Sequence, residues 1–213
     1  MDLFDNTIEL NPIKLVDGAV LLRGFALQYQ AQLLHDLQAV ITQAPLRHMV
    51  TPGGFTMSVA MTNCGKLGWV TDKTGYRYDT LNPSTGAPWP AMPESFKQLA
   101  AHAAAEAEFA DFAPDACLIN QYKIGARMSL HQDKNERDFS QPIVSVSLGV
   151  PAVFLFGGLT RKDKALRMTL NHADVVVWGA AARLRYHGIM RLAANQHPAF
   201  GDCRINLTFR KAG

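Results

Sequence analysis

Short apolar runs separated by turn residues dominate the second half of the chain. Glycine or proline falls between most of them, as at Pro142, Gly157-Gly158 and Gly179. Short β-type runs at such regular spacing are typical of a sandwich or jelly roll. The predicted strands cover residues 117–122, 128–133, 143–149, 152–156, 166–170, 174–178, 185–189 and 203–210.

Hydrophobic spacing in the first half predicts one strand and two helices. An apolar run at residues 18–22 predicts the strand. The first helix follows it and ends at Pro45, and the second begins after Pro93 and ends before Asp111. Their apolar faces consist of Leu33, Leu34, Leu37, Val40 and Ile41, and of Phe96, Leu99, Ala100, Ala103 and Ala107.

Residues 46–91 differ in character from the rest of the chain. Glycine and proline punctuate a stretch that contains Trp69, Tyr76 and Tyr78, which predicts hairpins and loops. Because no linker separates this stretch from its neighbours, we expect one α+β, mainly β domain over residues 1–213. Its parts would be an N-terminal strand and helix (1–45), a hairpin cover (46–92), a helix (93–115) and a β core (116–213).

The composition is that of an ordinary globular protein, with 48% hydrophobic and 18% charged residues among 213. No apolar run approaches the ~20 residues that a membrane-spanning helix needs. The N-terminus, residues 1–5, is acidic and lacks the basic start and apolar stretch of a secretory signal. Three widely spaced cysteines without a CxxC pair favour reduced thiols. We therefore expect a cytoplasmic monomer that does not contact membranes.

The charge balance leaves the nature of the partner open. A net charge of +3 and a pI near 8.8 permit binding to a polyanion, but a basic domain built for nucleic acid usually exceeds pI 9. Scattered surface charge explains the basic residues late in the chain equally well. These residues are Arg161, Lys162, Lys164, Arg167, Arg183, Arg185, Arg191, Arg204, Arg210 and Lys211.

His131 and Asp133 are separated by one residue, a spacing at which two side chains can bind one metal ion. In an extended chain both point the same way, about 6–7 Å apart along the strand. His187 follows far enough along the chain for several strands to bring it back to the same barrel mouth. Two histidines and one carboxylate leave one face of a metal open, as in non-haem Fe(II) oxygenases. Taken alone, the pair is equally compatible with a polar turn or an ion pair.

His172 and Asp174 form a second His-x-Asp pair. This pair directly precedes the apolar run at residues 175–178, where Asp174 is better placed to hold the turn at the start of a strand. We therefore prefer His131 and Asp133 as metal ligands. The other histidines have no companions at ligand spacing and are predicted to lie on the surface; they are His35, His48, His102 and His197.

Polar and apolar residues alternate strictly in the last predicted strand, so that one face is polar and the other belongs to the core. If the polar face were exposed, it would be an ordinary solvated side of a sheet. If it lies inside a barrel beside a metal, its guanidinium groups can receive a dicarboxylate, because guanidinium pairs bidentately with carboxylate. The polar face consists of Arg204, Asn206, Thr208 and Arg210.

Together these motifs resemble those of the AlkB family of Fe(II)/2-oxoglutarate dioxygenases. The resemblance includes the His131-x-Asp133 pair with its distal His187, and the Asn120-x-Tyr122 pair. The R-x-N-x-T-x-R motif of residues 204–210 is highly specific to that family at this distance from the distal histidine. Similarity covers essentially the whole chain and extends to residues 49–54, 58–65, 142–149 and 174–179.

The resemblance implies a double-stranded β-helix (jelly-roll) core with an N-terminal helical and hairpin nucleotide-recognition cover. It also implies Fe(II), 2-oxoglutarate and O2 as cofactor and cosubstrates, with the iron held by His131, Asp133 and His187. These three residues and Arg210 are the expected catalytic residues.

Family precedent further assigns Arg204, with Tyr122, to the far carboxylate of 2-oxoglutarate, and Arg210 with Asn120 to the near one. The residues expected around this cosubstrate are Leu118, Asn120, Gln121, Tyr122, Ile143, Ser145, Trp178, Arg204, Asn206, Thr208 and Arg210.

The implied reaction is oxidative demethylation of N-alkylated bases, of the 1-methyladenine and 3-methylcytosine type, in direct-reversal DNA repair. It would convert 2-oxoglutarate and O2 to succinate and CO2 and release the methyl group as formaldehyde. The substrate would be alkylated single-stranded or double-stranded DNA, with RNA as a further candidate. The target base has to be flipped out or already single-stranded. The expected substrate contacts are Thr51, Met57, Met61, Trp69, Tyr76, Arg77, Tyr78, Asn135 and Arg161.

Asn135 departs from the family pattern, because better-known bacterial members carry an acidic residue at this place. A carboxylate there favours cationic lesions, whereas an amide can still hydrogen-bond to the base edge but lacks the charge. Our hypothesis is that this protein discriminates less between cationic and neutral methylated bases.

The sequence leaves two other function classes open. One is a 2-oxoglutarate oxygenase that acts on a non-nucleic-acid substrate, such as a protein or a small molecule. The other is a cupin-like protein that binds metal or nucleic acid without turnover. Formation of succinate that depends on Fe(II) and 2-oxoglutarate separates an enzyme from the second class.

Overall fold

Two β-sheets lie face to face in the computed structural model, which describes residues 12–213. The larger sheet has eight strands in the order β1-β2-β12-β9-β14-β7-β4-β3, and the smaller has four in the order β11-β10-β13-β8. A third sheet is the two-stranded hairpin β5–β6. The strands are β1 (Ile13–Val16), β2 (Ala19–Leu22), β3 (Arg47–Val50), β4 (Thr56–Gly65), β5 (Gly68–Asp72), β6 (Gly75–Asp79), β7 (Ala116–Tyr122), β8 (Met128–His131), β9 (Ile143–Gly149), β10 (Ala152–Phe156), β11 (Leu166–Leu170), β12 (Val175–Trp178), β13 (His187–Ile189) and β14 (Arg204–Arg210).

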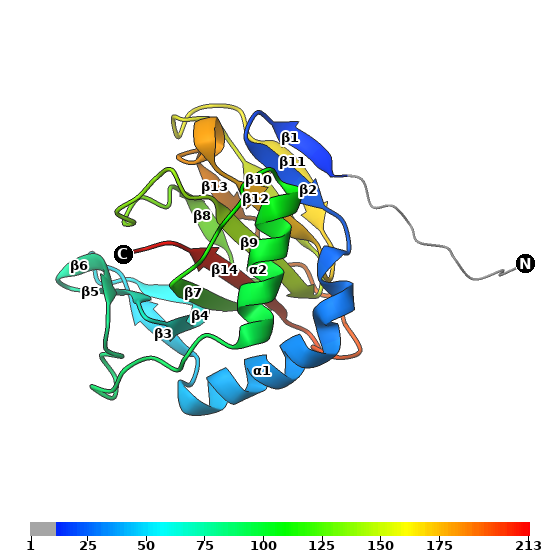
Figure 1. The fold of residues 1–213 in the computed structure, drawn as a ribbon. Helices are drawn as coiled ribbons and strands as arrows, with labels where there is room; N and C mark the ends of the chain where they lie inside the picture. Colours follow the sequence, from blue (N-terminus) through cyan, green and yellow to red (C-terminus); the bar gives the residue numbers. More distant parts are fainter. Residues whose placement is uncertain (1–11) are drawn as a thin grey trace, which may run out of the picture.

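Two helices cover the outer face of the larger sheet, as Figure 1 shows. They are α1 (Gln30–Gln43) and α2 (Glu94–Glu106), and short 3-10 turns occur at η1 (Phe25–Tyr29) and η2 (Ala180–Ala182). The helices bury the apolar stripes that their 3.6-residue periodicity produces. Phe96 of α2, for example, meets Phe209 of β14 edge-on, with ring centroids 5.9 Å apart.

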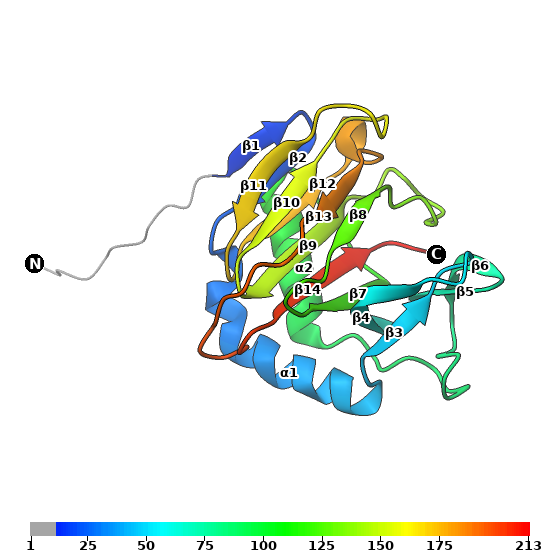
Figure 2. The same ribbon diagram turned by 180° about the vertical axis from the view of Figure 1, so that it is seen from behind.

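The inner face of the larger sheet is polar near its centre. In β14 the alternation sends Ile205, Leu207 and Phe209 into the core beneath the helices. The residues between them therefore face the smaller sheet, which lies in front of the larger one when the molecule is seen from behind (Figure 2). This arrangement creates a polar space between two otherwise apolar layers.

The predicted jelly-roll class is confirmed, and the strand bounds agree closely with the apolar runs. Two predicted strands end differently: β8 stops at His131, so Asp133 lies in the following loop, and β13 begins only at His187. The apolar spacing gave no sign of β1, which pairs with β2 at the edge of the sheet. The predicted acidic N-terminus at residues 1–5 lies outside the described residues.

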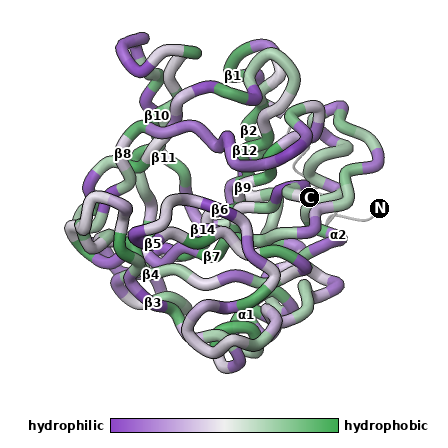
Figure 3. The backbone as a smooth tube through the Cα atoms, turned by 90° about the vertical axis from the view of Figure 1, so that its left-hand side faces the viewer, coloured by the Kyte–Doolittle hydropathy of each residue, from purple (hydrophilic) through white to green (hydrophobic). Residues whose placement is uncertain are grey.

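The stretch predicted as a hairpin cover, residues 46–92, contributes two strands to the larger sheet. β3 and β4 belong to the larger sheet, because β4 pairs with β7 along residues 60–65. Only the β5–β6 hairpin stands apart, and in the side view of Figure 3 it crosses in front of β14. Within residues 12–213, no helix has the length and apolar character needed to cross a bilayer.

Candidate metal and cosubstrate site

His131 and His187 face each other across the antiparallel strands β8 and β13, and their ring centroids lie 4.4 Å apart. Nδ1 of His131 lies 2.8 Å from the carbonyl oxygen of Ser129, and Nδ1 of His187 lies 3.1 Å from that of Arg185. A carbonyl only accepts, so each Nδ1 carries the proton and each Nε2 presents its lone pair. Gly188 permits this close strand approach, because a Cβ there would lie 2.6 Å from the carbonyl oxygen of Met128.

Asp133 completes a three-residue group. Its Oδ1 lies 3.7 Å from Nε2 of His131, and its Oδ2 lies 3.7 Å from Nε2 of His187. One ligand atom from each residue lies within 4.8 Å of the others, and this is the one such group of three among residues 12–213. Two imidazoles and one carboxylate are the ligand set that non-haem Fe(II) oxygenases use.

Arg210 keeps Asp133 ionised. Its Nε and Nη2 donate to Oδ2 of Asp133 at 2.9 and 2.6 Å. Burial alone would raise the pKa of Asp133, but the positive charge of Arg210 outweighs it and holds the pKa well below its usual range. The carboxylate is therefore available as an anionic ligand at any physiological pH.

His187 is held neutral by its surroundings. Burial lowers its pKa to about 4, and the nearby ring of His131 acts in the same direction, although Asp133 opposes it. A metal ligand has to be deprotonated before it binds. His187 thus needs no proton loss to bind a metal near neutral pH.

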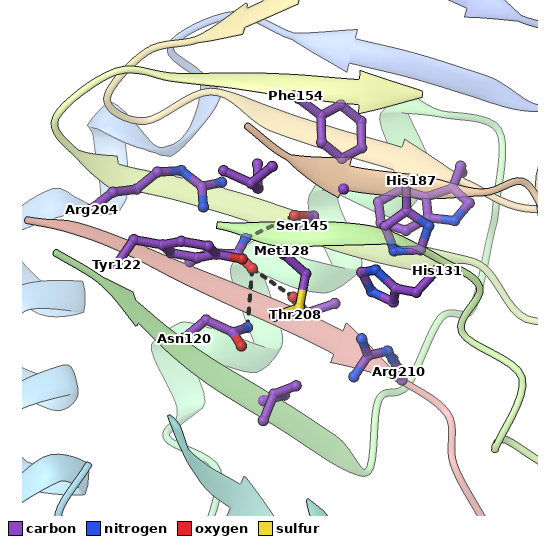
Figure 4. Close-up of a pocket in the computed structure, with 15 residues that line it drawn as sticks. Asn120, Tyr122, Met128, His131, Ser145, Phe154, His187, Arg204, Thr208 and Arg210 are labelled. Atoms are coloured by element: carbon purple, nitrogen blue, oxygen red, sulfur yellow. Dashed lines mark hydrogen bonds between the residues drawn. The ribbon is translucent and has the colours of Figure 1, made fainter. Parts of the chain in front are cut away.

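Arg204 lies at the far end of the same space, 1% exposed. Its Nη2 donates to Oγ of Ser147 at 2.8 Å, whereas Nε and Nη1 have no partner among the described residues. The guanidinium sits over the ring of Tyr122, 5.1 Å from its centroid. A buried cation with two unpaired donors destabilises the folded protein unless a bound anion accepts their hydrogen bonds. Figure 4 shows Arg204 and Tyr122 side by side, on the opposite side of the pocket from the two histidines.

Asn206 organises the floor of the pocket. Its Oδ1 accepts from Asn120 Nδ2 at 3.2 Å and from Thr208 Oγ1 at 2.9 Å. Its Nδ2 donates to Ser145 Oγ at 2.8 Å and to a backbone carbonyl (Figure 4). Asn206 has no donor left for a ligand, so it supports the face. Asn120 Oδ1 and Trp178 Nε1, by contrast, are buried without partners in the part of the chain that the structure describes, and remain available.

The residues present thus fit 2-oxoglutarate bound beside a metal. Unpaired donors lie at one end of the pocket, and a nitrogen and oxygen ligand set lies at the other. Most of the predicted cosubstrate residues line this space, namely Leu118, Asn120, Tyr122, Ser145, Trp178, Arg204, Asn206, Thr208 and Arg210.

Two predicted cosubstrate residues do not line the pocket. Gln121 lies between the pocket residues Asn120 and Tyr122 on β7 and pairs with Ile205 of β14. Because side chains alternate along a strand, Gln121 points to the helix side of the sheet. Ile143 is fully buried in the apolar layer beside the pocket. Four further residues line the pocket without having been predicted to contact the cosubstrate: Met128, Phe154, Gly188 and Ile189. Cross-strand pairing brings them there, and no local pattern reveals it.

The second His-x-Asp pair, His172 and Asp174, has a structural role. Oδ1 of Asp174 accepts from the backbone N–H of Gly24, and Oδ2 accepts from Arg23 and from the N–H of Asn171, so it holds the turn as predicted. His172 accepts from the N–H of Gly149. His197 is half-buried and lies against His172, with the two rings tilted and their centroids 4.4 Å apart.

Aromatic residues of the β5–β6 hairpin lie beside the loop that follows β8 and carries Asp133. The rings of Trp69 and Tyr76 stack with centroids 5.7 Å apart. Nε1 of Trp69 donates to Oδ1 of Asn135 at 3.2 Å, and the hydroxyl of Tyr78 donates to Glu136 at 2.6 Å. These contacts place three of the predicted substrate residues next to the segment that carries Asp133.

The other predicted substrate residues are more scattered. Arg77 lies between Tyr76 and Tyr78 on β6. It pairs with Asp72 and Asp79 of its own hairpin, so its charge is already neutralised. Met61 is fully buried in β4, opposite Asn120. Arg161 is exposed in the β10–β11 loop, above the ring of Tyr186. Thr51 and Met57 are half-buried at either end of the β3–β4 turn.

Comparison with known proteins identifies the family. The model of the 2OG-Fe(II) oxygenase superfamily matches residues 18–210. The alpha-ketoglutarate-dependent dioxygenase AlkB of Escherichia coli (strain K12) is 59% identical over 93% of this chain and 92% of its own length. The chain belongs to the AlkB family of 2OG-Fe(II) oxygenases.

Other members of the AlkB family agree with this assignment. The solved structure of OsALKBH1 has a TM-score of 0.82 and 29% identity, over 94% of this chain and 99% of its own. The human nucleic acid dioxygenase ALKBH1 is 32% identical over 61% of this chain and 33% of its own length. The predicted enzyme class and the use of Fe(II), 2-oxoglutarate and O2 are therefore confirmed.

Proposed function

We propose that this AlkB-family enzyme oxidatively demethylates N-alkylated bases in DNA, of the 1-methyladenine and 3-methylcytosine type, as a direct-reversal repair reaction. One observation carries the proposal: stacked aromatic rings of the β5–β6 hairpin lie beside the loop that presents Asp133. An oxygenase for a small soluble metabolite has no need of such a platform. The relationship to the human nucleic acid dioxygenase supports the same substrate class.

The metal and cosubstrate roles follow from the unpaired groups of the pocket. His131 and His187 present Nε2 lone pairs and Asp133 presents an ionised carboxylate, which together hold Fe(II). Arg204 binds the far carboxylate of 2-oxoglutarate, and burial raises the pKa of Tyr122, so its hydroxyl stays protonated as a donor. When bound, iron and 2-oxoglutarate supply the oxidising power of the reaction. The chain's residues orient both groups and exclude water.

Base recognition requires the target to leave the stack. A base inside a duplex cannot reach a metal between two sheets, so it enters flipped out or from a single strand. Stacking on an aromatic side chain is worth about 1–3 kcal/mol per base, which offsets much of the cost of extrusion. We assign Trp69 and Tyr76 to base stacking and the exposed Arg161 to a backbone phosphate.

The proposal also covers the type of nucleic acid, the oligomeric state and the location of the protein. Both single-stranded and double-stranded alkylated DNA are substrates, and RNA is a further candidate, because stacking and phosphate contacts do not distinguish the sugars. The protein acts as a monomer in the cytoplasm, where bacterial DNA is accessible. The cover at residues 46–92 serves nucleotide recognition, mainly through the β5–β6 hairpin.

Mass spectrometry of a methylated oligonucleotide tests the proposal. The oligonucleotide carries one 3-methylcytosine and is incubated with the enzyme, Fe(II), 2-oxoglutarate, ascorbate and air. We expect loss of the methyl group with wild type and none with His131→Ala. Succinate formation with the oligonucleotide intact would instead favour an oxygenase for a protein or small molecule. Absence of succinate under every condition would favour a binding protein without turnover.

A further inference from the structure

The loop between β8 and β9, residues 132–142, carries Asp133 outside any strand. A buried guanidinium holds this loop at two points. Nη1 of Arg183 donates to the carbonyl oxygen of Asp133 at 2.8 Å, and its Nε donates to that of Gln141 at 3.0 Å. Because the loop lacks ladder hydrogen bonds, its backbone position next to the metal depends on such contacts.

Glu136 is the acidic partner in this network. Its Oε2 accepts from Nη2 of Arg183 at 3.1 Å, and its Oε1 accepts from the hydroxyl of Tyr78 at 2.6 Å. The side chains of Glu136 and Arg183 are only 2% and 3% exposed. Groups buried this deeply keep their charge only when they are paired and hydrogen-bonded. Glu136 thus joins the loop that carries Asp133 to Arg183, which directly follows η2, and to the β5–β6 hairpin.

Glu136 also contacts the arginine that binds the metal ligand. Its Oε1 lies 3.6 Å from Nε of Arg210, which donates twice to Asp133. A cation bonded to Asp133 draws negative charge away from a carboxylate that a metal also needs. Glu136 offsets part of that positive charge, since interactions between buried groups are weakly screened.

We propose that Glu136 and Arg183 are positioning residues for the metal ligand Asp133, and that Tyr78 connects the β5–β6 hairpin to the metal site. A substitution in the hairpin then changes metal affinity, although no hairpin residue is a ligand. Residues that hold metal ligands in place commonly change metal affinity by 10–100-fold when they are replaced.

Titration of Mn(II) into the metal-free full chain, followed by the paramagnetic resonance signal of the free ion, measures metal affinity without turnover. Glu136→Gln keeps the shape and removes the charge, and we expect its Kd to rise about 10-fold. Tyr78→Phe removes one hydrogen bond to Glu136, and we expect a rise of about threefold, the size of one net hydrogen bond. Thermal unfolding of the same metal-free samples reports stability separately.

Two matched controls separate positioning from general stability. Asp174→Asn removes a buried carboxylate that pairs with Arg23, and Tyr29→Phe removes a hydroxyl that contacts His102, both away from the metal group. Their Kd for Mn(II) stays at the wild-type value even where their unfolding temperature falls. Wild-type Kd values for Glu136→Gln and Tyr78→Phe would overturn the proposal. If Glu136→Gln does not fold, Tyr78→Phe decides: a raised Kd supports the link and an unchanged Kd overturns it.

Discussion

His131 and His187 are direct cross-strand partners on the smaller sheet, whereas Arg204 and Arg210 belong to the larger one. The site therefore spans both layers of the jelly roll. The group of three metal-ligating residues comes mainly from one layer, and the groups proposed to bind the cosubstrate come from the other. Any change in how the sheets pack therefore alters the distance between the metal ligands and the groups proposed to bind the cosubstrate.

Replacing Arg204 by methionine is expected to have opposite effects on stability and on cosubstrate binding. The ligand-free protein gains about 1–3 kcal/mol of unfolding free energy, because a buried cation with two donors unpaired within residues 12–213 is removed. The KM for 2-oxoglutarate rises roughly 100-fold, since two charged hydrogen bonds are lost. Chemical denaturation and succinate assays check the two effects. An unchanged KM contradicts the assigned role of Arg204.

Asn63 is expected to position Trp69. This fully buried side chain accepts from the backbone N–H of Trp69 at 2.9 Å and donates to its carbonyl at 3.0 Å. Asn63→Ala should cost about 1–3 kcal/mol of stability. It should also raise the KM for a methylated oligonucleotide and leave the KM for 2-oxoglutarate unchanged.

Thr62→Val is the matched control for that experiment. Thr62 precedes Asn63 on β4 and loses one buried hydrogen bond, to the carbonyl of Ala44, when it is replaced. We expect it to lower stability without changing the KM for the oligonucleotide. Equal oligonucleotide KM values for Asn63→Ala and Thr62→Val would show that Trp69 does not depend on Asn63.

Asn135→Asp is expected to change lesion selectivity. The carboxylate oxygen can still accept from Trp69 Nε1, so the contact at 3.2 Å survives while a negative charge is added. Hydrogen bonds to charged groups exceed neutral ones by about 1 kcal/mol or more, which predicts a roughly fivefold to tenfold rise in preference for cationic 3-methylcytosine over neutral 3-methylthymine. The ratio of the two kcat/KM values measures this preference. Identical ratios for wild type and variant would refute the hypothesis about Asn135.

Acid is expected to destabilise the metal-free protein through His187. Burial lowers its pKa from 6.5 to about 4 in the folded state, so the unfolded chain binds more protons between those values. The contribution of neutral His187 to the free energy of unfolding is therefore fully present above about pH 6.5. It decreases by about 3 kcal/mol as the pH falls towards 4. Denaturant unfolding of wild type and His187→Gln across this range measures the difference. Parallel stability curves for the two proteins would contradict the neutral state of His187.

Local sequence patterns predicted most elements, because apolar periodicity and turn residues act over short distances. The alternation in residues 204–210 predicts that the two arginines share one face, and β14 has that alternation. The patterns were less informative about strand partners. Pairing of β4 with β7 makes part of the cover a sheet strand, and no residue in β4 indicates its partner.

The burial of charged side chains could not be predicted from the sequence either. Glu136 and Arg183 look like ordinary surface residues in a polar loop and a turn, yet both are buried and paired. Asp133 was placed in a strand, although it follows β8 in the loop that Arg183 holds. Such placements depend on contacts between distant segments, which alternation along one segment does not encode.

The stoichiometry of the reaction tests the central claim most directly. A single-stranded oligonucleotide with one 3-methylcytosine is incubated with wild-type enzyme, Fe(II), 2-oxoglutarate and O2, and succinate, formaldehyde and unmethylated cytosine are quantified. An oxidative base demethylase produces the three in equal amounts, and His131→Ala produces none of them. Succinate that accumulates at the same rate with an unmethylated oligonucleotide, without formaldehyde, would contradict the account.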